Sequence, residues 1–526
     1  MEELKKDERN QSVILSAGLM SLGTLGSRIL GLLRDVVLAA FFSRTVTDAF
    51  VVAFSFPNKF RRLLGEGSLS VSFIPVYIEA REKTPEQAQQ LSHGIFTLLV
   101  LVSSLLCVLG IIFMEPIMEL LVGGKGFISV AGKLDITIFL ARIMFSYLFL
   151  VSTYAFCMAL LQAHQQFFLA ALAPALFNLT FIILAMLPIK GVAVPGTLLA
   201  WAVIFGGVVQ AITVIIPLWR QNLMPKLIWR WKSKKVLMVL KNMVPGIIGM
   251  GVLQFLTLVN INYASQLSEG SHSYIYWADR ILELPQSLIA ISLGAALLPT
   301  LSQLWAKDRK TEMLKQGQDH FLTLLFLAMP SAVGMYVLAQ PIVEVLYLRG
   351  RFTLQDAVTT AEVVKIYSVL LVAVSLSKVV VPNFYAVKNT WLPAITSVLS
   401  IVCHIVLAYF LVKSHGLNGL IISMTISGYI NLILTMGYYQ KLIGPLQWKY
   451  LSKNFLHFIP ALLAMGIFAK YFYEFFIGMS VTTHVTLQKS LVLLVTIALS
   501  IVIYFVVSSL TKVPQADKVL RRLKVR

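Results

Sequence analysis

The chain has 526 residues, of which 58% are hydrophobic and 13% charged, and its formal net charge is +20. Soluble globular proteins are about 45–50% apolar and about 25% charged, so this composition excludes that class and indicates a polytopic membrane protein. The cation excess does not indicate nucleic-acid binding, because most of the cations lie in loops that can face one side of a membrane.

Runs of about 20 apolar residues predict fourteen membrane-spanning helices in an all-α fold. Several runs, such as the second and the eighth, are longer than a straight span needs, so we expect these helices to tilt, bend or extend past the membrane. In chain order the predicted helices cover 12–42, 46–78, 92–114, 134–161, 168–188, 192–217, 236–266, 273–303, 320–343, 357–385, 391–412, 416–440, 454–473 and 487–510.

The distribution of Lys and Arg predicts that both chain ends face the cytoplasm. With the N-terminus inside, the predicted inner loops and tails carry 26 Lys and Arg and the outer loops carry 8. This asymmetry is the positive-inside bias of membrane proteins. The first apolar run is too long for a cleaved signal peptide, so we expect it to be a retained membrane helix.

Short matches between the two halves of the chain predict an internal duplication. "SLSVSFIP" ends at Pro75 and "SLGAALLP" ends at Pro299, an offset of 224. Two further pairs lie at offsets of 223 and 225: Ala163 with Ala386, and Gly191 with Gly416. Because six helices per copy is an even number, the two copies would share one orientation as a parallel repeat, which is a known transporter plan.

The duplication predicts a four-part organisation. An N-terminal lobe of helices 1–6 covers 1–218, and a C-terminal lobe of helices 7–12 covers 236–441. Between them lies a basic cytoplasmic linker, 219–235, whose Trp-rich sequence is typical of an interfacial amphipathic segment. Helices 13 and 14 with a basic tail, 442–526, form an appendage.

Charged residues inside the predicted helices mark a candidate substrate path, because such residues are costly unless they face a bundle interior or a wet cavity. Arg28 and Asp35 are seven residues apart and share a helix face. Local explanations remain open: helix-two cations can snorkel, Asp48 can sit at a helix N-terminus, and Arg34 with Asp35 can be a structural pair. The candidate substrate-binding residues are Arg28, Arg34, Asp35, Asp48, Arg61, Arg62, Glu66, Asp279, Arg280 and Glu283.

The predicted helices as a whole contain more Lys and Arg than Asp and Glu. This cation excess favours an anionic substrate, since the Arg fork fits phosphate oxygens bidentately. A carrier of cationic drugs would need an acidic cavity. No phosphate-binding Gly-rich loop, GxSxG or HExxH motif is present, and the three cysteines lie far apart, so we expect neither an enzyme nor a metal or cofactor site. A membrane glycan polymerase and a scaffold that recruits other proteins are the alternatives of other classes.

Five stretches resemble the MurJ (MviN) family of bacterial lipid II flippases, which belongs to the multidrug, oligosaccharidyl-lipid and polysaccharide exporter superfamily. They are "SRILGLLRD", "TDAF", "FPNKFRRLLGEGSLSVSFIP", "ADRILELP" and "FYAVKNT". The resemblance implies fourteen helices, and transport of the undecaprenyl-pyrophosphate-linked peptidoglycan precursor across the bacterial inner membrane by alternating access. The family's essential charges match the ten candidate residues above.

The resemblance also bears on the energy source of transport. Some family members are thought to bind sodium through acids between helices seven and eleven, but this chain has no Asp or Glu in 236–266 or 363–473. We therefore expect no sodium site of that kind, and expect the membrane potential or an ion gradient to drive a monomer that binds lipid II and membrane lipids. An exporter of another lipid-linked oligosaccharide is the alternative within transport.

Overall fold

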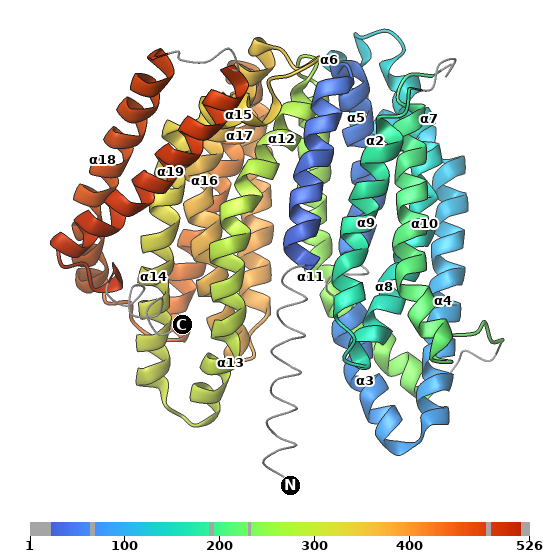
Figure 1. Ribbon diagram of the computed structural model, residues 1–526. Coiled ribbons are helices and arrows are strands. Elements are labelled where there is room, and N and C mark those ends of the chain that lie inside the picture. The colour runs from blue at the N-terminus through green and yellow to red at the C-terminus, as the bar shows by residue number, and fades with distance from the viewer. Residues whose placement is uncertain (1–22, 64–68, 189–193, 230–232, 480–484, 517–526) are drawn as a thin grey trace. The chain divides into compact units, whose positions relative to one another are not determined.

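The computed structural model describes residues 23–63, 69–188, 194–229, 233–479 and 485–516, and these residues form helices and connecting loops without a β-strand (Figure 1). The first helix covers 23–41 of the described residues. The others are α2 (Arg44–Leu63), α3 (Leu69–Lys83), α4 (Pro85–Ile112), α5 (Met114–Val122), α6 (Lys125–Ile128), α7 (Lys133–Phe145), α8 (Tyr147–Ala163), α9 (Phe168–Ala185), α10 (Thr197–Arg220), α11 (Lys234–Ser265), α12 (Ser271–Pro285), the π-helix η2 (Gln286–Ile291), α13 (Ser292–Ala306), α14 (Lys310–Val337), α15 (Ala339–Tyr347), α16 (Leu354–Ala386), α17 (Trp391–Leu442), α18 (Trp448–Gly478) and α19 (Val485–Leu510).

Each predicted apolar run coincides with a helix or with a broken helix. The second run contains α2 and α3, with residues 64–68 outside the described residues, and the eighth contains the π-helical segment η2 between α12 and α13. The predicted boundary between helices eleven and twelve lies inside α17, which breaks at Gly416 because its φ of 55° and ψ of −130° are not helical. Nine helices among the described residues are long and apolar enough to span a membrane, so the count of fourteen stays a prediction.

Local sequence signals explain where two of the long helices begin. Thr84 caps α4 by accepting a hydrogen bond from Gln87 N, and Pro85 follows at the first helical position, where its missing N–H costs nothing. α16 begins with a capping box, in which Thr353 and Asp356 each accept from the other's backbone N–H.

The chain divides by its contacts into two compact units, Met1–Ser273 and Tyr274–Arg526. In the first unit α8 is the central helix and packs against α3, α4 and α10, with Leu148, Phe156 and Leu160 fully buried. α11 packs along α2, α3 and α5 and counts with this unit. The division therefore falls after the predicted linker 219–235, whereas the predicted lobes follow the sequence repeat.

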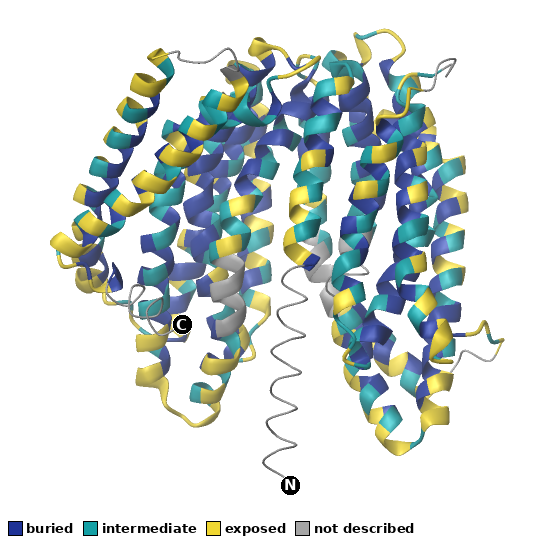
Figure 2. Ribbon diagram, in the orientation of Figure 1, coloured by how far each residue is buried: buried dark blue, intermediate teal, exposed yellow. Residues whose placement is uncertain are grey.

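The second unit is built around α16, which packs between α14 and α17 and contacts α13 and α15. α18 and α19 pack against each other and close over the α14–α15 corner, where Leu338, Ala469, Tyr473 and Leu493 form a buried cluster. Figure 2 shows exposed positions along both helices. They include apolar residues such as Leu463 and Leu494, as expected of helices that face lipid. The predicted appendage is thus fastened to the second unit.

The internal repeat is visible in the bounds of the helices. α4 and α14 begin at 85 and 310 and end at 112 and 337, a constant offset of 225. α5 and α15 begin at 114 and 339 and end at 122 and 347, again an offset of 225. Ala163 and Ala386 end α8 and α16 as their motif predicts, while Gly191 lies outside the described residues.

The loops after these two helices also agree. Gln165 and Lys388, 223 positions apart, both take a left-handed backbone with φ of 60°. Non-Gly residues rarely adopt this conformation, so its presence at the same point of both units supports a register of 223 for α7–α8 against α16.

Within the predicted linker, residues 221–229 are not helical. Their backbone lies along α4, where Lys226 N donates to His93 Nδ1 at 3.1 Å and Ile228 N donates to Thr97 Oγ1 at 3.0 Å. Trp229 is 95% exposed, which fits the expectation that this segment places aromatic rings at a membrane interface.

Candidate functional site

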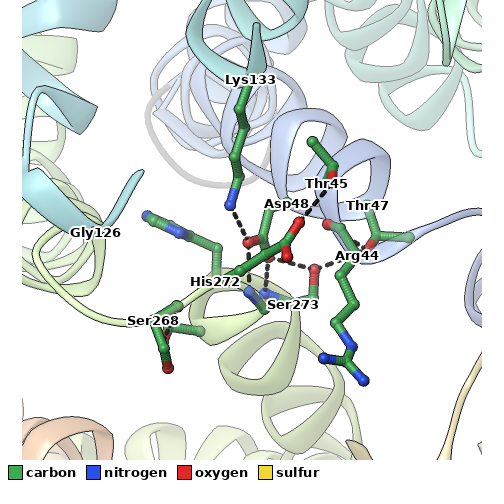
Figure 3. A network of polar contacts seen from close by, with 12 residues as sticks. Arg44, Thr45, Thr47, Asp48, Gly126, Lys133, Ser268, His272 and Ser273 are labelled. Atoms are coloured by element: carbon green, nitrogen blue, oxygen red, sulfur yellow. Dashed lines mark hydrogen bonds and ion pairs between the residues drawn. The ribbon is translucent and has the colours of Figure 1, made fainter. Parts of the chain in front are cut away.

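Asp48, the fifth residue of α2, lies at the centre of a buried polar network (Figure 3). Its Oδ2 accepts from Lys133 Nζ and from Gly270 N, both at 2.7 Å. Its Oδ1 accepts from Ser273 N at 2.9 Å and from Ser273 Oγ at 2.6 Å. Asp48 is 0% exposed and Lys133 is 1% exposed, so the ion pair is fully withdrawn from solvent.

This network joins α2, the start of α7 and residues 270–273 at the end of the first unit. A buried ion pair is tolerated only when hydrogen bonds satisfy its remaining polar atoms, and here four donors converge on one carboxylate. The alternative that Asp48 is the N-terminal charge of its own helix is not confirmed, because the first turn of α2 has no acid and Asp48 accepts from Gly270 N and Ser273 N at the start of α12. A carboxylate so fully engaged positions the chain and leaves no oxygen for a ligand.

Arg34 and Asp35 form a second buried polar group, on the first helix. Arg34 Nη2 and Nε donate to Asp35 Oδ1 at 2.9 and 3.1 Å, and Arg34 Nη1 donates to Asn178 Oδ1 on α9 at 3.2 Å. Asn178 Nδ2 in turn donates to the Ser27 carbonyl at 3.1 Å. Arg34 is 7% exposed and Asp35 is 1% exposed, so this pair fixes the first helix to α9.

Arg28 differs from Arg34 because it is exposed. The apolar side chains of Leu25 and Ile29 are 52% and 53% exposed on the same helix. The Arg28 guanidinium therefore lies among exposed apolar side chains, an environment that suits a ligand that is both charged and lipophilic.

The helix-two residues are only partly described. Arg61 and Arg62 lie on the last turn of α2, but their side chains fall outside the described residues, as does all of Glu66. Arg62 and Glu66 are four residues apart, a spacing that permits an ion pair, and this pairing stays a prediction.

The helix-eight cluster lies on α12 in the second unit. Arg280 Nη1 donates to Glu283 Oε2 at 2.8 Å, and Nη2 donates to Tyr276 Oη at 3.2 Å. The guanidinium carbon lies 4.9 Å from the Tyr276 ring centre. The Arg280 side chain is 25% exposed, while Asp279 faces the buried Tyr367 hydroxyl on α16. Two neighbours thus hold Arg280 in a fixed direction with part of its surface accessible.

Three buried partners were missed in the sequence. Lys133 lies one residue before a predicted helix and Asp356 one residue before another, so both read as loop charges, yet each is 1% exposed. Asp356 Oδ1 accepts from Tyr274 Oη at 2.7 Å. Asn178 carries no charge, so the search for charged residues inside helices did not find it. No group of three or more His, Cys, Asp or Glu that could hold a metal occurs among the described residues.

Comparison with known proteins identifies the family. The family model described as "Lipid II flippase MurJ" matches residues 37–512. The chain is 44% identical over 520 residues to a probable lipid II flippase MurJ of Bdellovibrio bacteriovorus, covering 98% of each protein. The chain belongs to the MurJ family. A lipid II flippase MurJ of Burkholderia cenocepacia is 32% identical and covers 78% of this chain and 80% of its own.

Solved structures agree with this family. A lipid II flippase MurJ in an inward closed conformation superposes with a TM-score of 0.77 at 25% identity, covering 97% of this chain and 100% of its own. An inward-facing multidrug transporter of the MATE family gives a TM-score of 0.67 at 16% identity, covering 81% of this chain and 96% of its own, which shows the shared fold alone. A MurJ family member is a membrane transporter, so the glycan polymerase and scaffold alternatives are set aside.

Proposed function

We propose that this chain moves lipid II, the undecaprenyl-pyrophosphate-linked peptidoglycan precursor, from the inner to the outer leaflet of the bacterial inner membrane. The observation that carries the proposal is that the MurJ family match runs over residues 37–512, nearly the whole chain. The long apolar helices are consistent with this assignment, since nine among the described residues can span a bilayer.

The accessible arginines are the proposed ligands of the pyrophosphate. Arg28 is exposed and Arg280 is one-quarter exposed, and a guanidinium binds phosphate oxygens with two parallel hydrogen bonds. Glu283 and Tyr276 hold Arg280 in one direction, which lowers the entropy lost when an anion binds. We propose Arg61 and Arg62 as further phosphate ligands.

The buried groups have a supporting part in this proposal. Arg34 spends its donors on Asp35 and Asn178, so it would hold the first helix in place and so aim Arg28. Asp48 would likewise have a structural role, because its ion pair with Lys133 holds α2 against α7.

We further propose that a monomer with cytoplasmic termini works by alternating access and that the membrane potential drives it. An inside-negative potential pushes the anionic head group outward and draws the emptied cationic cavity inward. Each elementary charge that crosses contributes about 2.3 kcal/mol per 100 mV. The polyprenyl tail would remain in lipid beside α18 and α19.

Complementation combined with flipping in vesicles tests this function. The chain replaces the resident flippase of a depleted bacterium, and Arg28→Ala and Arg280→Ala are compared with the wild type at equal membrane levels. Arg142→Ala is the matched control, because Arg142 is also a helical arginine paired with a carboxylate, Glu115, but is 44% exposed.

The wild type and the control should support growth, whereas each test variant should flip lipid II at least about tenfold more slowly, since one charge-assisted hydrogen-bonded contact is worth about 1.5–3 kcal/mol. Rescue by both test variants would remove the arginines from the mechanism. Faster transport of a lipid with the same pyrophosphate but another glycan would instead make the chain an exporter of that lipid. An unchanged rate after collapse of the potential would refute the proposed energy source.

A further inference from the structure

A cavity of about 390 Å³ opens on the second unit between α14, α16 and the second half of α17. Its polar lining consists chiefly of Glu362, Lys365 and Asn418, and its apolar lining includes Ile366 and Val369. None of these residues belongs to the transport site proposed above. A cavity that combines both signs of charge with an apolar wall requires a physical reason in a membrane protein, where unpaired charges are costly.

The lining is polar at one end of the cavity and apolar at the other, like an amphiphilic molecule. On α16 the residues Glu362, Lys365, Ile366 and Val369 follow the spacing i, i+3, i+4, i+7, so they form one stripe that is charged towards the start of the helix and apolar further along. On the second half of α17, Asn418 lies near the break at Gly416, and the apolar lining follows it along the helix.

One hydrogen bond aligns the two polar ends. Asn418 Nδ2 donates to Glu362 Oε2 at 3.0 Å, so the charged part of one stripe lies beside the amide of the other. Tyr336, 53% exposed and one residue before the end of α14, lines the same opening. Exposed tyrosines are enriched at the level of lipid head groups, so the polar end of the cavity lies where a head group would.

The two charges do not satisfy each other. Glu362 and Lys365 have a spacing that permits an ion pair, yet Glu362 bonds to Asn418 instead. Among the described residues no carboxylate lies within ion-pair distance of the Lys365 ammonium. A separated cation and anion at the polar end of an apolar groove match the separated charges of a zwitterionic head group.

The corresponding position of the first unit has different side chains. In the 223 register Lys365 corresponds to Arg142, which pairs with Glu115 at 3.3 Å. Glu115 corresponds, at 225, to Gln340, which is neutral and donates to Glu344 instead. Glu362 corresponds to Phe139, an exposed apolar residue. The second unit therefore has an amide where the first has the acid that pairs with its cation, and it has an acid one turn before its own cation.

We propose that this cavity binds one membrane phospholipid whose head group carries a primary amine next to its phosphate. The Lys365 ammonium binds the phosphate, the Glu362 carboxylate accepts hydrogen bonds from the amine, and an acyl chain lies along Ile366 and Val369. The proposal does not depend on which lipid the chain transports. In the predicted orientation the site faces the outer leaflet.

Native mass spectrometry of the purified full-length chain tests the site. The protein in detergent is titrated with phosphatidylethanolamine, phosphatidylglycerol and phosphatidylcholine of equal acyl composition, and with soluble phosphoethanolamine. Glu362→Gln and Lys365→Gln are the test variants. Arg142→Gln is the control, since it removes the corresponding cation of the first unit, and size-exclusion profiles establish that all variants are folded.

The wild type and the control should bind one phosphatidylethanolamine about tenfold more tightly than the other two lipids, because only this head group offers both an anion and a hydrogen-bonding cation. Each test variant should lose about tenfold of that affinity. Unchanged affinity in both variants would overturn the site. If phosphatidylglycerol bound more tightly and its binding were insensitive to Glu362→Gln, the ligand would not be a zwitterionic lipid. If soluble phosphoethanolamine bound equally well, the ligand would not need to be a membrane lipid.

Discussion

The two units place a buried polar contact at nearly the same point of the repeat, but the second unit has an acid where the first has a cation. In the first unit the acid is Asp48 on α2, and its partner on α7 is Lys133. In the second unit the acid is Asp356 on α16, 223 positions after Lys133, and its partner on α12 is the neutral Tyr274. Lys133 and Asp356 are each 1% exposed, so the repeat retains the position of the contact while the side chains that make it differ.

The difference lies in how each acid is satisfied. Asp356 Oδ2 accepts from Thr353 N at 2.8 Å and from Thr353 Oγ1 at 2.7 Å, so much of its satisfaction comes from its own helix start. Asp48 depends on donors from α7 and from residues 270–273. The first unit is therefore the more vulnerable of the two to loss of a single partner.

Lys133→Met should have the largest effect, because it leaves Asp48 buried without its cation. Removing one partner of a buried ion pair costs about 3–5 kcal/mol, enough to remove most folded protein from the membrane. Thermal unfolding of the purified protein, followed by size exclusion, measures the loss. Lys125→Met, which changes an exposed residue nearby, is the control.

The double variant Asp48→Asn with Lys133→Met sharpens the same test. It removes both charges, so it should be more stable than Lys133→Met alone. If the double variant were the less stable of the two, the damage would come from lost packing around Lys133 and not from an unpaired charge.

Tyr274→Phe should have a smaller effect in the second unit. It removes one donor while Thr353 continues to satisfy Asp356, so the expected loss is about 1–2 kcal/mol. The same unfolding measurement applies, with Tyr336→Phe as control because Tyr336 is 53% exposed. A loss as large as that of Lys133→Met would contradict the distinction between the two units.

Glu115→Gln should have the smallest effect. It gives the first unit the amide that the second unit has at Gln340. It breaks only the pair with Arg142, in which the Arg142 side chain is 44% exposed and the Glu115 side chain 59% exposed. Exposed pairs contribute about 0–1 kcal/mol, so the unfolding temperature should stay within error. A clear loss of stability would show that Arg142 is worth more than its exposure indicates.

The fold followed from the sequence to the extent that hydropathy and helix breakers determine it. Apolar runs predicted where helices lie, and the Gly416 and Ala163–Ala386 motifs predicted a helix break and two helix ends. The second run contains α2 near its start and α3 near its end, and residues 64–68 between them lie outside the described residues, so its continuity stays a prediction. The length of an apolar run also cannot predict a π-helical turn such as η2, because such a turn depends on local packing.

The site was predictable in its charges but not in its contacts. Arg34 with Asp35 was open as a structural pair, and the structure gives them that arrangement with Asn178 added. Lys133 and Asp356 could not be recognised as buried, since a charge at the end of an apolar run has the same sequence whether it faces water or a partner. Only tertiary packing distinguishes the two, and these partners lie 85 and 82 residues away.

The pair that fastens α19 has a consequence for how the chain is made. Lys489 Nζ donates to Glu344 Oε2 at 2.7 Å across 145 residues of sequence. A ribosome that adds about 5–20 residues per second reaches Lys489 roughly 7–30 s after Glu344, whereas Lys133 follows Asp48 within about 4–17 s. Of these two acids, Glu344 therefore waits the longer for its cation. A chain whose synthesis stops before α19 would present this carboxylate without its partner, a defect that membrane quality control can recognise.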